Sequence, residues 1–338
     1  MTFSEKYSKI LSVVQEDIDK INLLDGIDIQ EPLKSSLLNI LNAPSKHIRP
    51  LVSFLYLKAS GFEIDENQVE YQTAIELVHN ASLIHDDVID ESDVRRTVST
   101  INSEFDSKLA VIAGDYLLSV AMKKVINIGI PKLVDMFCET LKYMTLGEIS
   151  QYFDKFKVPS IERYIEKSEQ KTAKLFETAL EGAILINRHS EALAEESQNI
   201  MGSFALLRMT YSDSICQSFA KNFGIAFQIR DDLINCLTSK SDITEGVYTA
   251  PVIFSRCHCE GVKRPSQSYN NEITTSKTLF SPRNDECVSD VNITDIGIEN
   301  TKTLLNNYVE TAHQSLLKLE DNVYRQKLIE LLGLLRDE

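Results

Sequence analysis

Residues 76–96 read ELVHNASLIHDDVIDESDVRR, an apolar run that ends in a group of aspartates. Its apolar residues recur at three- and four-residue spacing, which is typical of a helix packed on a core. Asp86 and Asp90 are four residues apart and project from the same side of such a helix, with Asp87 beside them. Clustered carboxylates repel one another unless a cation lies between them, and Mg²⁺ prefers oxygen ligands and commonly binds together with substrate phosphates.

Two arginines, Arg95 and Arg96, follow the aspartates directly. Guanidinium groups bind phosphate oxygens in a bidentate manner. Carboxylates for a metal beside arginines for an anion favour a site for a metal-bound phosphate or diphosphate. For such a motif taken alone, a solvated acidic helix face is the alternative interpretation.

A second carboxylate pair makes the metal site the better interpretation. Asp231 and Asp232 lie in GIAFQIRDDLIN (224–235), at the end of another apolar helical run. Two such clusters at the ends of long helices could face each other across a helical cavity and share metal ions.

Six ordered blocks of the chain resemble the trans-isoprenyl (polyprenyl) diphosphate synthases, and the resemblance runs along most of its length. The blocks are SKHIRP (45–50), ELVHNASLIHDDVIDESDVRR (76–96), LAVIAGDYLL (109–118), KTAKLF (171–176), GIAFQIRDD (224–232) and SDITEGVYTAPVI (241–253). The resemblance implies an all-α fold, a bundle of antiparallel helices around a deep central cavity with the aspartates at its mouth. It also implies one polyprenyl synthase domain over 1–338 and a homodimer.

The composition agrees with a helical protein that buries a large core. Glycine (12) and proline (8) are sparse, and 43% of the residues are hydrophobic. The spacing of apolar residues predicts helices at 3–20, 30–42, 46–60, 66–90, 105–127, 131–153, 160–186, 190–210, 213–236, 246–255, 298–319 and 322–336. The exception is the polar stretch 256–292, which we predict to be a mobile insertion within the domain. Its Cys257, His258, Cys259 and Cys287 lack a paired zinc-ligand spacing, so a zinc site is the weaker alternative.

Charge and hydropathy limit the partners and the location. The net charge of −15 argues against nucleic acid as a partner. The chain lacks a run of about eighteen uncharged apolar residues, and its N-terminal sequence lacks an apolar signal core. We therefore expect a cytoplasmic protein with at most transient membrane contact, and its six cysteines as reduced thiols.

The resemblance implies a specific reaction and a role for each matching residue. Enzymes of this family ionise an allylic diphosphate, let the isopentenyl diphosphate double bond attack the carbocation, and then remove a proton. Metal ions neutralise the departing diphosphate. By resemblance, Asp86, Asp90 and Asp231 would hold Mg²⁺, Asp87 and Asp232 would support them, Arg95, Lys171 and Thr172 would face the allylic diphosphate, and Gln228 would lie near the reacting carbons.

Isopentenyl diphosphate carries no metal in this family and requires a basic pocket. Lys46, Arg49, His79 and Arg96 match the positions that form it. Taken alone, Lys46 and Arg49 could simply open a helix, and His79 could be a hydrogen-bonded core residue. The surrounding match favours the pocket.

Several positions depart from the family pattern. Asn235 replaces the last carboxylate of the second cluster, and Val247 stands where the family commonly has the lysine of Glu-Gly-Lys. Val247 removes one cation from the allylic diphosphate, for which Lys240 could compensate. These departures keep a second hypothesis open, a weakly active or non-catalytic subunit of a heteromeric synthase. A class I terpene cyclase is a third hypothesis, although it would not need the isopentenyl pocket.

Product length can be predicted from packing. Ala81 and Ser82 lie about one helical turn before Asp86, where the growing chain would descend. Two small side chains leave this path open, whereas an aromatic residue would close it. We therefore predict a product longer than C20, of the class used as quinone side-chain precursors, with Met122 and Phe137 as candidate floor residues.

Overall fold

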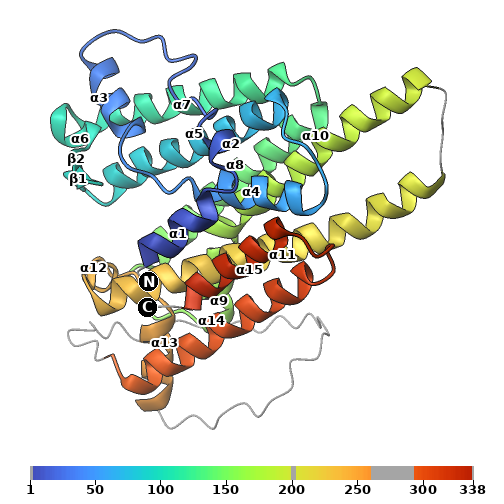
Figure 1. The fold of residues 1–338 in the computed structure, drawn as a ribbon. Helices are drawn as coiled ribbons and strands as arrows, with labels where there is room; N and C mark the ends of the chain where they lie inside the picture. Colours follow the sequence, from blue (N-terminus) through green and yellow to red (C-terminus); the bar gives the residue numbers. More distant parts are fainter. Residues whose placement is uncertain (1–2, 199–202, 260–292, 337–338) are drawn as a thin grey trace.

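The computed structural model describes residues 3–198, 203–259 and 293–336, and in these ranges the protein is built from helices and one small hairpin (Figure 1). The helices are α1 (Phe3–Leu11), α2 (Gln15–Ile18), α3 (Leu33–Leu41), α4 (Ile48–Ala59), α5 (Glu66–Ile89), α6 (Ile101–Glu104), α7 (Ser107–Asn127), α8 (Pro131–Asp154), α9 (Ile161–Ser168), α10 (Lys174–Gln198), α11 (Ser203–Leu237), α12 (Ser241–Thr244), α13 (Ala250–Cys259), α14 (Asp295–Leu316) and α15 (Val323–Arg336). The predicted all-α class is confirmed.

Local signals account for several helix starts. The Asp65 carboxylate accepts a hydrogen bond from the Gln68 backbone N–H at 2.8 Å and caps α5. Asp106 caps α7 in the same way through the Leu109 N–H, also at 2.8 Å. These caps begin the two long helices that pack side by side, α5 and α7 (Figure 1).

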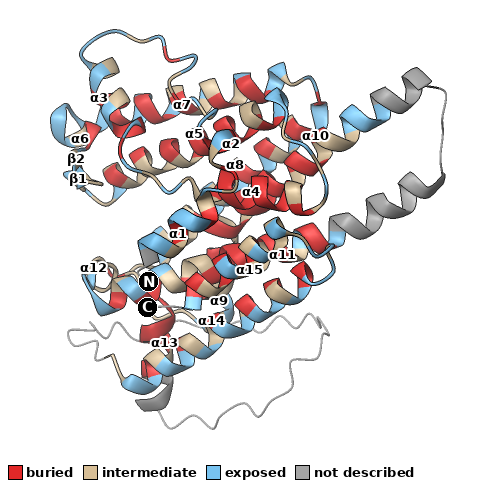
Figure 2. Ribbon diagram, viewed as in Figure 1, coloured by how far each residue is buried: buried red, intermediate tan, exposed pale blue. Residues whose placement is uncertain are grey.

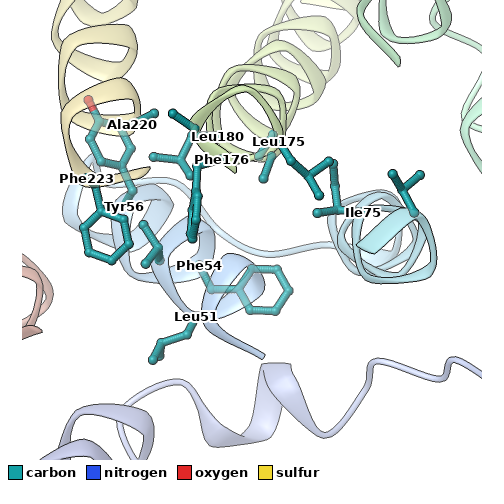
Figure 3. Close-up of a cluster of buried hydrophobic side chains, with 14 of the residues drawn as sticks. Leu51, Phe54, Tyr56, Ile75, Leu175, Phe176, Leu180, Ala220 and Phe223 are labelled. Carbon is teal, nitrogen blue, oxygen red and sulfur yellow. The ribbon is translucent and has the colours of Figure 1, made fainter. Parts of the chain in front are cut away.

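The core is centred on α4, where most side chains are buried (Figure 2). Tyr56 of α4 stacks on Phe219 of α11 with ring centroids 5.5 Å apart. Phe176 of α10 meets Phe223 edge-on at 5.2 Å (Figure 3). These aromatic contacts join α4, α10 and α11 in one core, and α5 contributes Ile75 to it. The long helices that carry the aspartates are therefore held by a common apolar interior.

The helix boundaries differ from the predicted ones at two places, on either side of α10. The predicted helix 160–186 is divided by a π-helical turn, Glu169–Ala173, between α9 and α10. The predicted helix 190–210 is not separate, because α10 continues to Gln198 and α11 begins at Ser203.

A hairpin that sequence patterns did not predict follows α5. Strands β1 (Val94–Arg95) and β2 (Val98–Ser99) pair antiparallel, with Val94 opposite Ser99. The chain reverses at Arg96 and Thr97, which have positive φ angles of 48° and 70°. Thr97, a residue other than glycine, thus takes a left-handed conformation in this turn.

Two further predictions concern parts of the chain that are only partly described. In the insertion 256–292, residues 260–292 lie outside the described ranges, and so does Cys287 of the zinc alternative. Among the helices that the structure describes, none is long and apolar enough to cross a membrane.

Candidate active site

The first aspartate cluster is positioned by the end of α5. Asp86 and Asp87 lie in the last turn of this helix and Asp90 is its C-cap, with the Asp90 N–H donating to the Asp86 carbonyl at 2.8 Å. The C-terminus of a helix carries partial negative charge, so carboxylates are unfavourable there unless a cation is near. The sequence thus places three negative charges where the helix itself opposes them.

Two cations of the protein approach these carboxylates. The Lys171 ammonium lies 3.8 Å from an Asp86 carboxylate oxygen and forms an ion pair with Glu148 of α8. The Arg95 Nε donates to Asp87 at 2.6 Å. Lys171 and Arg95, which were predicted to face the allylic diphosphate, thus lie beside the first aspartate cluster, and Glu148 is an acidic neighbour that the sequence did not indicate.

The carboxyl groups of the first cluster have raised pKa values. Burial raises the pKa of Asp86 to about 6, and the neighbouring Glu148 and Asp90 carboxylates add to the rise while Lys171 opposes it. Burial also raises the pKa of Asp90 and Asp87. The cluster therefore holds more negative charge than the nearby cations neutralise, as expected of a site that binds a further cation.

The second cluster is held by neutral hydrogen bonds. Asp232 of α11 accepts the Tyr164 hydroxyl at 2.6 Å and the Gln228 amide at 2.7 Å. Thr172 in turn donates its hydroxyl to Gln228. Burial raises the pKa values of both Asp231 and Asp232 to about 6. Tyr164 was not predicted, because no motif marks a tyrosine that meets its partner only across two helices.

A π-helical turn joins the two clusters. Its adjacent residues Lys171 and Thr172 reach in different directions, Lys171 to Asp86 of the first cluster and Thr172 to the Gln228–Asp232 pair of the second. The turn packs tightly on α11, since a Cβ added at Gly224 would lie 2.5 Å from the backbone of Ala173. Glycine in GIAFQIRDD thus permits the close approach, and π-helical turns are frequent at functional sites.

The predicted basic residues come together beside the second cluster. Arg49 is 7% exposed, its guanidinium carbon lies 4.9 Å from the centre of the Phe176 ring, and its buried Nε has no hydrogen-bond partner. Burial lowers the pKa of His79 well below its usual value, and the nearby charges of Arg49 and Arg96 lower it further. Burial and the charge of Arg230 lower the pKa of Lys46, while Asp231 raises it.

One buried acid offsets part of this positive charge. Glu76 is 1% exposed, and a carboxylate oxygen lies 3.1 Å from His47 Nδ1. Its charge raises the pKa values of Arg49 and Arg96, against the lowering by burial. Glu76 stands ten residues before Asp86 in the same quoted stretch, but its role required knowing that α4 packs against α5. The basic cluster is thus charged and only partly neutralised.

The residues that depart from the family pattern near the second cluster can be located in the structure. The Asn235 amide donates to Ser241 Oγ at 2.9 Å, while its buried Oδ1 has no hydrogen-bond partner. Lys240, the residue expected to compensate for Val247, is exposed and has a positive φ of 55°. Asp242 was not predicted to take part, yet burial and the charge of Asp232 raise its pKa to about 6.

The residues predicted to control product length are buried in or near the core. Ala81 is fully buried, and Ser82 is half-buried and donates to the His79 carbonyl at 2.8 Å. Phe137 is buried against Tyr71, with ring centroids 5.4 Å apart, and Met122 packs at the edge of the core. The role of these residues in product length stays a prediction.

The donor set fits divalent cations bound with a ligand. In the described part of the chain, no three acidic, histidine or cysteine side chains form a ready-made metal site. Mg²⁺ commonly takes one or two carboxylates and completes its octahedron with water and phosphate oxygens. The carboxylates of Asp86 and Asp231, which Lys171 and Arg230 approach only to 3.8 and 3.6 Å, and the Asn235 Oδ1 without a hydrogen-bond partner suit that mode of binding.

Fold and site together define an all-helical protein in which two aspartate clusters, each with one buried carboxylate (Asp87 and Asp232), lie near a basic cluster around the buried Arg49, a donor set that suits anionic ligands bound with metal ions. The sequence profile of the polyprenyl synthetase family matches residues 30–279, and the chain belongs to this family. The predicted family is thereby confirmed.

Relatives of this chain include long-chain synthases and proteins named prenyl transferases. The chain is 30% identical to a decaprenyl-diphosphate synthase of Dictyostelium discoideum over 353 aligned positions, which cover 96% of this chain and 71% of the relative. It is 28% identical to an octaprenyl diphosphate synthase of Haemophilus influenzae, with 74% of each covered. These relatives are prenyl-transferring enzymes, as the sequence predicted.

Solved structures share the fold. A decaprenyl diphosphate synthase of Rhodobacter capsulatus superposes with a TM-score of 0.75 at 20% identity, with 98% of both chains covered. A polyprenyl synthase of Caulobacter crescentus, complexed with calcium and isoprenyl diphosphate, superposes with a TM-score of 0.76 at 18% identity and the same coverage. The predicted helical architecture is confirmed by these likenesses.

Proposed function

We propose that this chain condenses an allylic diphosphate with isopentenyl diphosphate and releases a trans-polyprenyl diphosphate longer than C20. The observation that carries the proposal is the pairing of two different anion sites. Acidic clusters on α5 and α11 suit a diphosphate that arrives with metal ions, and the cluster around Arg49 suits one that arrives without them. Family membership and the long-chain relatives support the same reaction.

Asp86, Asp90 and Asp231 would hold Mg²⁺, which supplies Lewis-acid neutralisation of the departing diphosphate. Asp87 orients Arg95 through their 2.6 Å hydrogen bond, and Asp232 orients Gln228 through theirs at 2.7 Å. These pairings fix side chains before substrate binds, so little reorganisation is needed as charge develops.

Each remaining site residue has a separate task in the proposed reaction. Lys171 presents its ammonium to the allylic diphosphate next to Asp86. Thr172 holds the Gln228 amide, which faces the reacting carbons and the allylic cation. Lys46, Arg49, His79 and Arg96 bind isopentenyl diphosphate, with His79 kept neutral as a hydrogen-bonding group by burial and its arginine neighbours, which lower its pKa. The proton that is lost passes to the released pyrophosphate.

The test is an incubation of the purified chain with labelled isopentenyl diphosphate, Mg²⁺ and allylic primers of several lengths. Products are dephosphorylated and sized. A discrete polyprenol longer than C20 is expected. Absence of elongation with every primer, in protein with a cooperative thermal transition, would contradict the proposal and favour the second candidate, a non-catalytic subunit, which Asn235 and Val247 support.

The ruler for product length can be tested at Ala81. Ala81→Phe places a ring on α5 about one turn before the metal-binding aspartates, so the product is expected to shorten to C20 or less. Ser119→Phe, at an exposed position of α7, is a control for the added ring and should leave the length unchanged. An unchanged product from folded Ala81→Phe protein would refute the ruler.

We further propose a homodimer formed through the outer face of α7 and α8. Exposed apolar residues gather on these helices, Val111 and Ile112 on α7 and Tyr143, Leu146 and Ile149 on α8. Residues 143, 146 and 149 share one helical face. Contiguous exposed apolar surface of this kind marks interaction sites.

The exposed rings of Tyr152, Phe153 and Phe156 are the proposed point of transient membrane contact. A cytoplasmic location stays a prediction.

A further inference from the structure

Lys167 is a half-buried lysine that the proposed mechanism does not yet use. It belongs to α9 and precedes Lys171 by four residues, a spacing that places both side chains on neighbouring positions of one helical face. Lys171 is paired with Glu148, whereas no carboxylate of the described residues forms an ion pair with the Lys167 ammonium. A cation in this position is available to an incoming anion.

Lys167 lines a cavity together with Val247, the residue that stands where the family commonly has lysine. Tyr164 and Tyr248 line the same cavity. Tyr164 also donates its hydroxyl to Asp232 at 2.6 Å, so one wall of the cavity contacts the second aspartate cluster, while the carboxylate that lines the cavity itself, Asp154, is paired with Arg163 at 3.2 Å. Position 247, where the lysine is lost, and Lys167 therefore line one cavity, and a wall of that cavity touches Asp232.

Backbone contacts hold this arrangement in place. The Val247 N–H donates to the Asp242 carbonyl at 2.7 Å, and the Phe156 N–H donates to the Gly246 carbonyl at 2.7 Å. Gly246 has a positive φ of 76°, and a Cβ there would lie 2.6 Å from the Phe156 ring. The Glu-Gly-Val turn is thus packed against the segment between α8 and α9, which keeps position 247 close to Lys167.

The charges that act on Lys167 include carboxylates in and near the second cluster. Burial lowers the pKa of this lysine, the carboxylates of Asp232 and Asp242 raise it, and the charge of Lys171 lowers it. The ammonium is therefore partly desolvated in the field of the carboxylates that border the proposed diphosphate site. Partly desolvated charges interact with a bound anion more strongly than exposed ones.

We propose that Lys167 binds the diphosphate of the allylic substrate and supplies the cation that Val247 removes from the Glu-Gly-Val turn. The inference rests on the proposed prenyl transfer and adds to it a substrate-binding residue from a different element. The lysine side chain is long and flexible, and its ammonium acts as a point charge. A lysine at position 167 and a lysine at position 247 can therefore place the same charge at one point of the cavity.

The proposal is tested by exchanging the positions of the two charges. Lys167→Met removes the ammonium and keeps the length of the side chain. Val247→Lys in that background returns a cation to the cavity from the turn. Lys157→Met is the matched control, because Lys157 lines the same cavity but donates to the Phe153 carbonyl at 3.1 Å.

The measurement is calorimetric binding of inorganic pyrophosphate with Mg²⁺. Lys167→Met is expected to weaken binding about tenfold, the loss of roughly one charge-assisted hydrogen bond. The dissociation constant of the control Lys157→Met should lie within about twofold of the wild-type value. That of the double variant Lys167→Met/Val247→Lys should lie within about threefold of it. Because merely structural damage at position 167 would not be repaired by a charge at position 247, the rescue distinguishes binding from support.

Each of the other possible outcomes contradicts a specific part of the proposal. Unchanged pyrophosphate binding in Lys167→Met overturns the role of Lys167. Weakened binding that Val247→Lys does not restore, in protein with a wild-type melting curve, overturns the replacement of one lysine by the other. If Lys167→Met does not fold, Lys167→Gln serves in its place. A wild-type chain that binds no pyrophosphate with Mg²⁺ refutes the proposed function itself, independently of Lys167.

Discussion

The two aspartate clusters differ in how the protein balances their charge. On α5, the carboxylates are met by cations, Arg95 on Asp87 and Lys171 near Asp86. On α11, Asp232 accepts hydrogen bonds from the neutral donors Tyr164 and Gln228, while Asp231 pairs with Arg230 at 3.6 Å. Both arrangements leave carboxyl groups whose pKa burial raises to about 6. The comparison indicates that the protein keeps both clusters short of positive charge, which leaves the neutralisation to the ligand.

The largest effect is expected from removing a carboxylate whose charge the cations of the protein neutralise only in part. Asp86→Asn is expected to lower kcat/KM for prenyl transfer by about 100- to 1000-fold, the usual cost of removing one preorganised electrostatic group. Asp135→Asn is the control, since this exposed residue of α8 pairs with the neighbouring Lys132 at 2.6 Å, away from the aspartate clusters in the sequence. A loss of less than about tenfold would show that the first cluster does not carry the reaction.

A second test makes the clusters more alike. Asn235→Asp gives the second cluster a third carboxylate, in place of the amide whose buried Oδ1 has no hydrogen-bond partner. The Mg²⁺ concentration for half-maximal activity is expected to fall about fivefold, because one more anionic oxygen attracts the ion.

The measurement for Asn235→Asp is a Mg²⁺ titration of elongation at saturating substrates. Ser241→Ala separates charge from local geometry, since it removes the hydroxyl to which Asn235 donates at 2.9 Å without adding charge. Equal or weaker Mg²⁺ affinity in Asn235→Asp would mean that position 235 does not face the metal.

The smallest expected effect concerns stability without ligand. Asp86 and Asp231 have pKa values of about 6 in the fold, above the ordinary 3.8. A carboxyl group with a raised pKa contributes stability that is fully present below the unfolded value and is lost as pH rises through the folded value. In metal-free protein, Asp86→Asn should raise Tm at pH 7.5 by about 2–4 °C, equivalent to roughly 1 kcal/mol. Asp231→Asn should raise it by less, because the Asp231 side chain is 48% exposed and solvent screens its charge. Both variants should leave Tm unchanged near pH 4.

Thermal unfolding at several pH values checks this prediction and compares the clusters directly. Mg²⁺ with pyrophosphate should raise the Tm of the wild-type chain more than that of either variant, because the ligand binds the folded state only. If one variant were stabilised and the other not, the two clusters would differ in charge balance despite their similar pKa values.

Much of the site could be predicted because its residues lie on regular helices. The spacing of Asp86 and Asp90 on an apolar run, and the order of the matched blocks, indicated the family and the aspartate clusters. Tyr164 and Glu148 could not be predicted in the same way, since each meets its partner from another helix. The hairpin at Val94–Ser99 was also missed, because it depends on left-handed conformations of non-glycine residues.

Helical periodicity and six motifs were sufficient, by themselves, to determine an all-α protein of the polyprenyl synthetase family. These signals are local, because residues three or four apart must share a face. Only the tertiary structure decided which charges meet, that Lys171 and Thr172 connect the two clusters and that Lys167 faces Val247. Such contacts depend on how the helices pack, and burial then determines how strongly each charge acts.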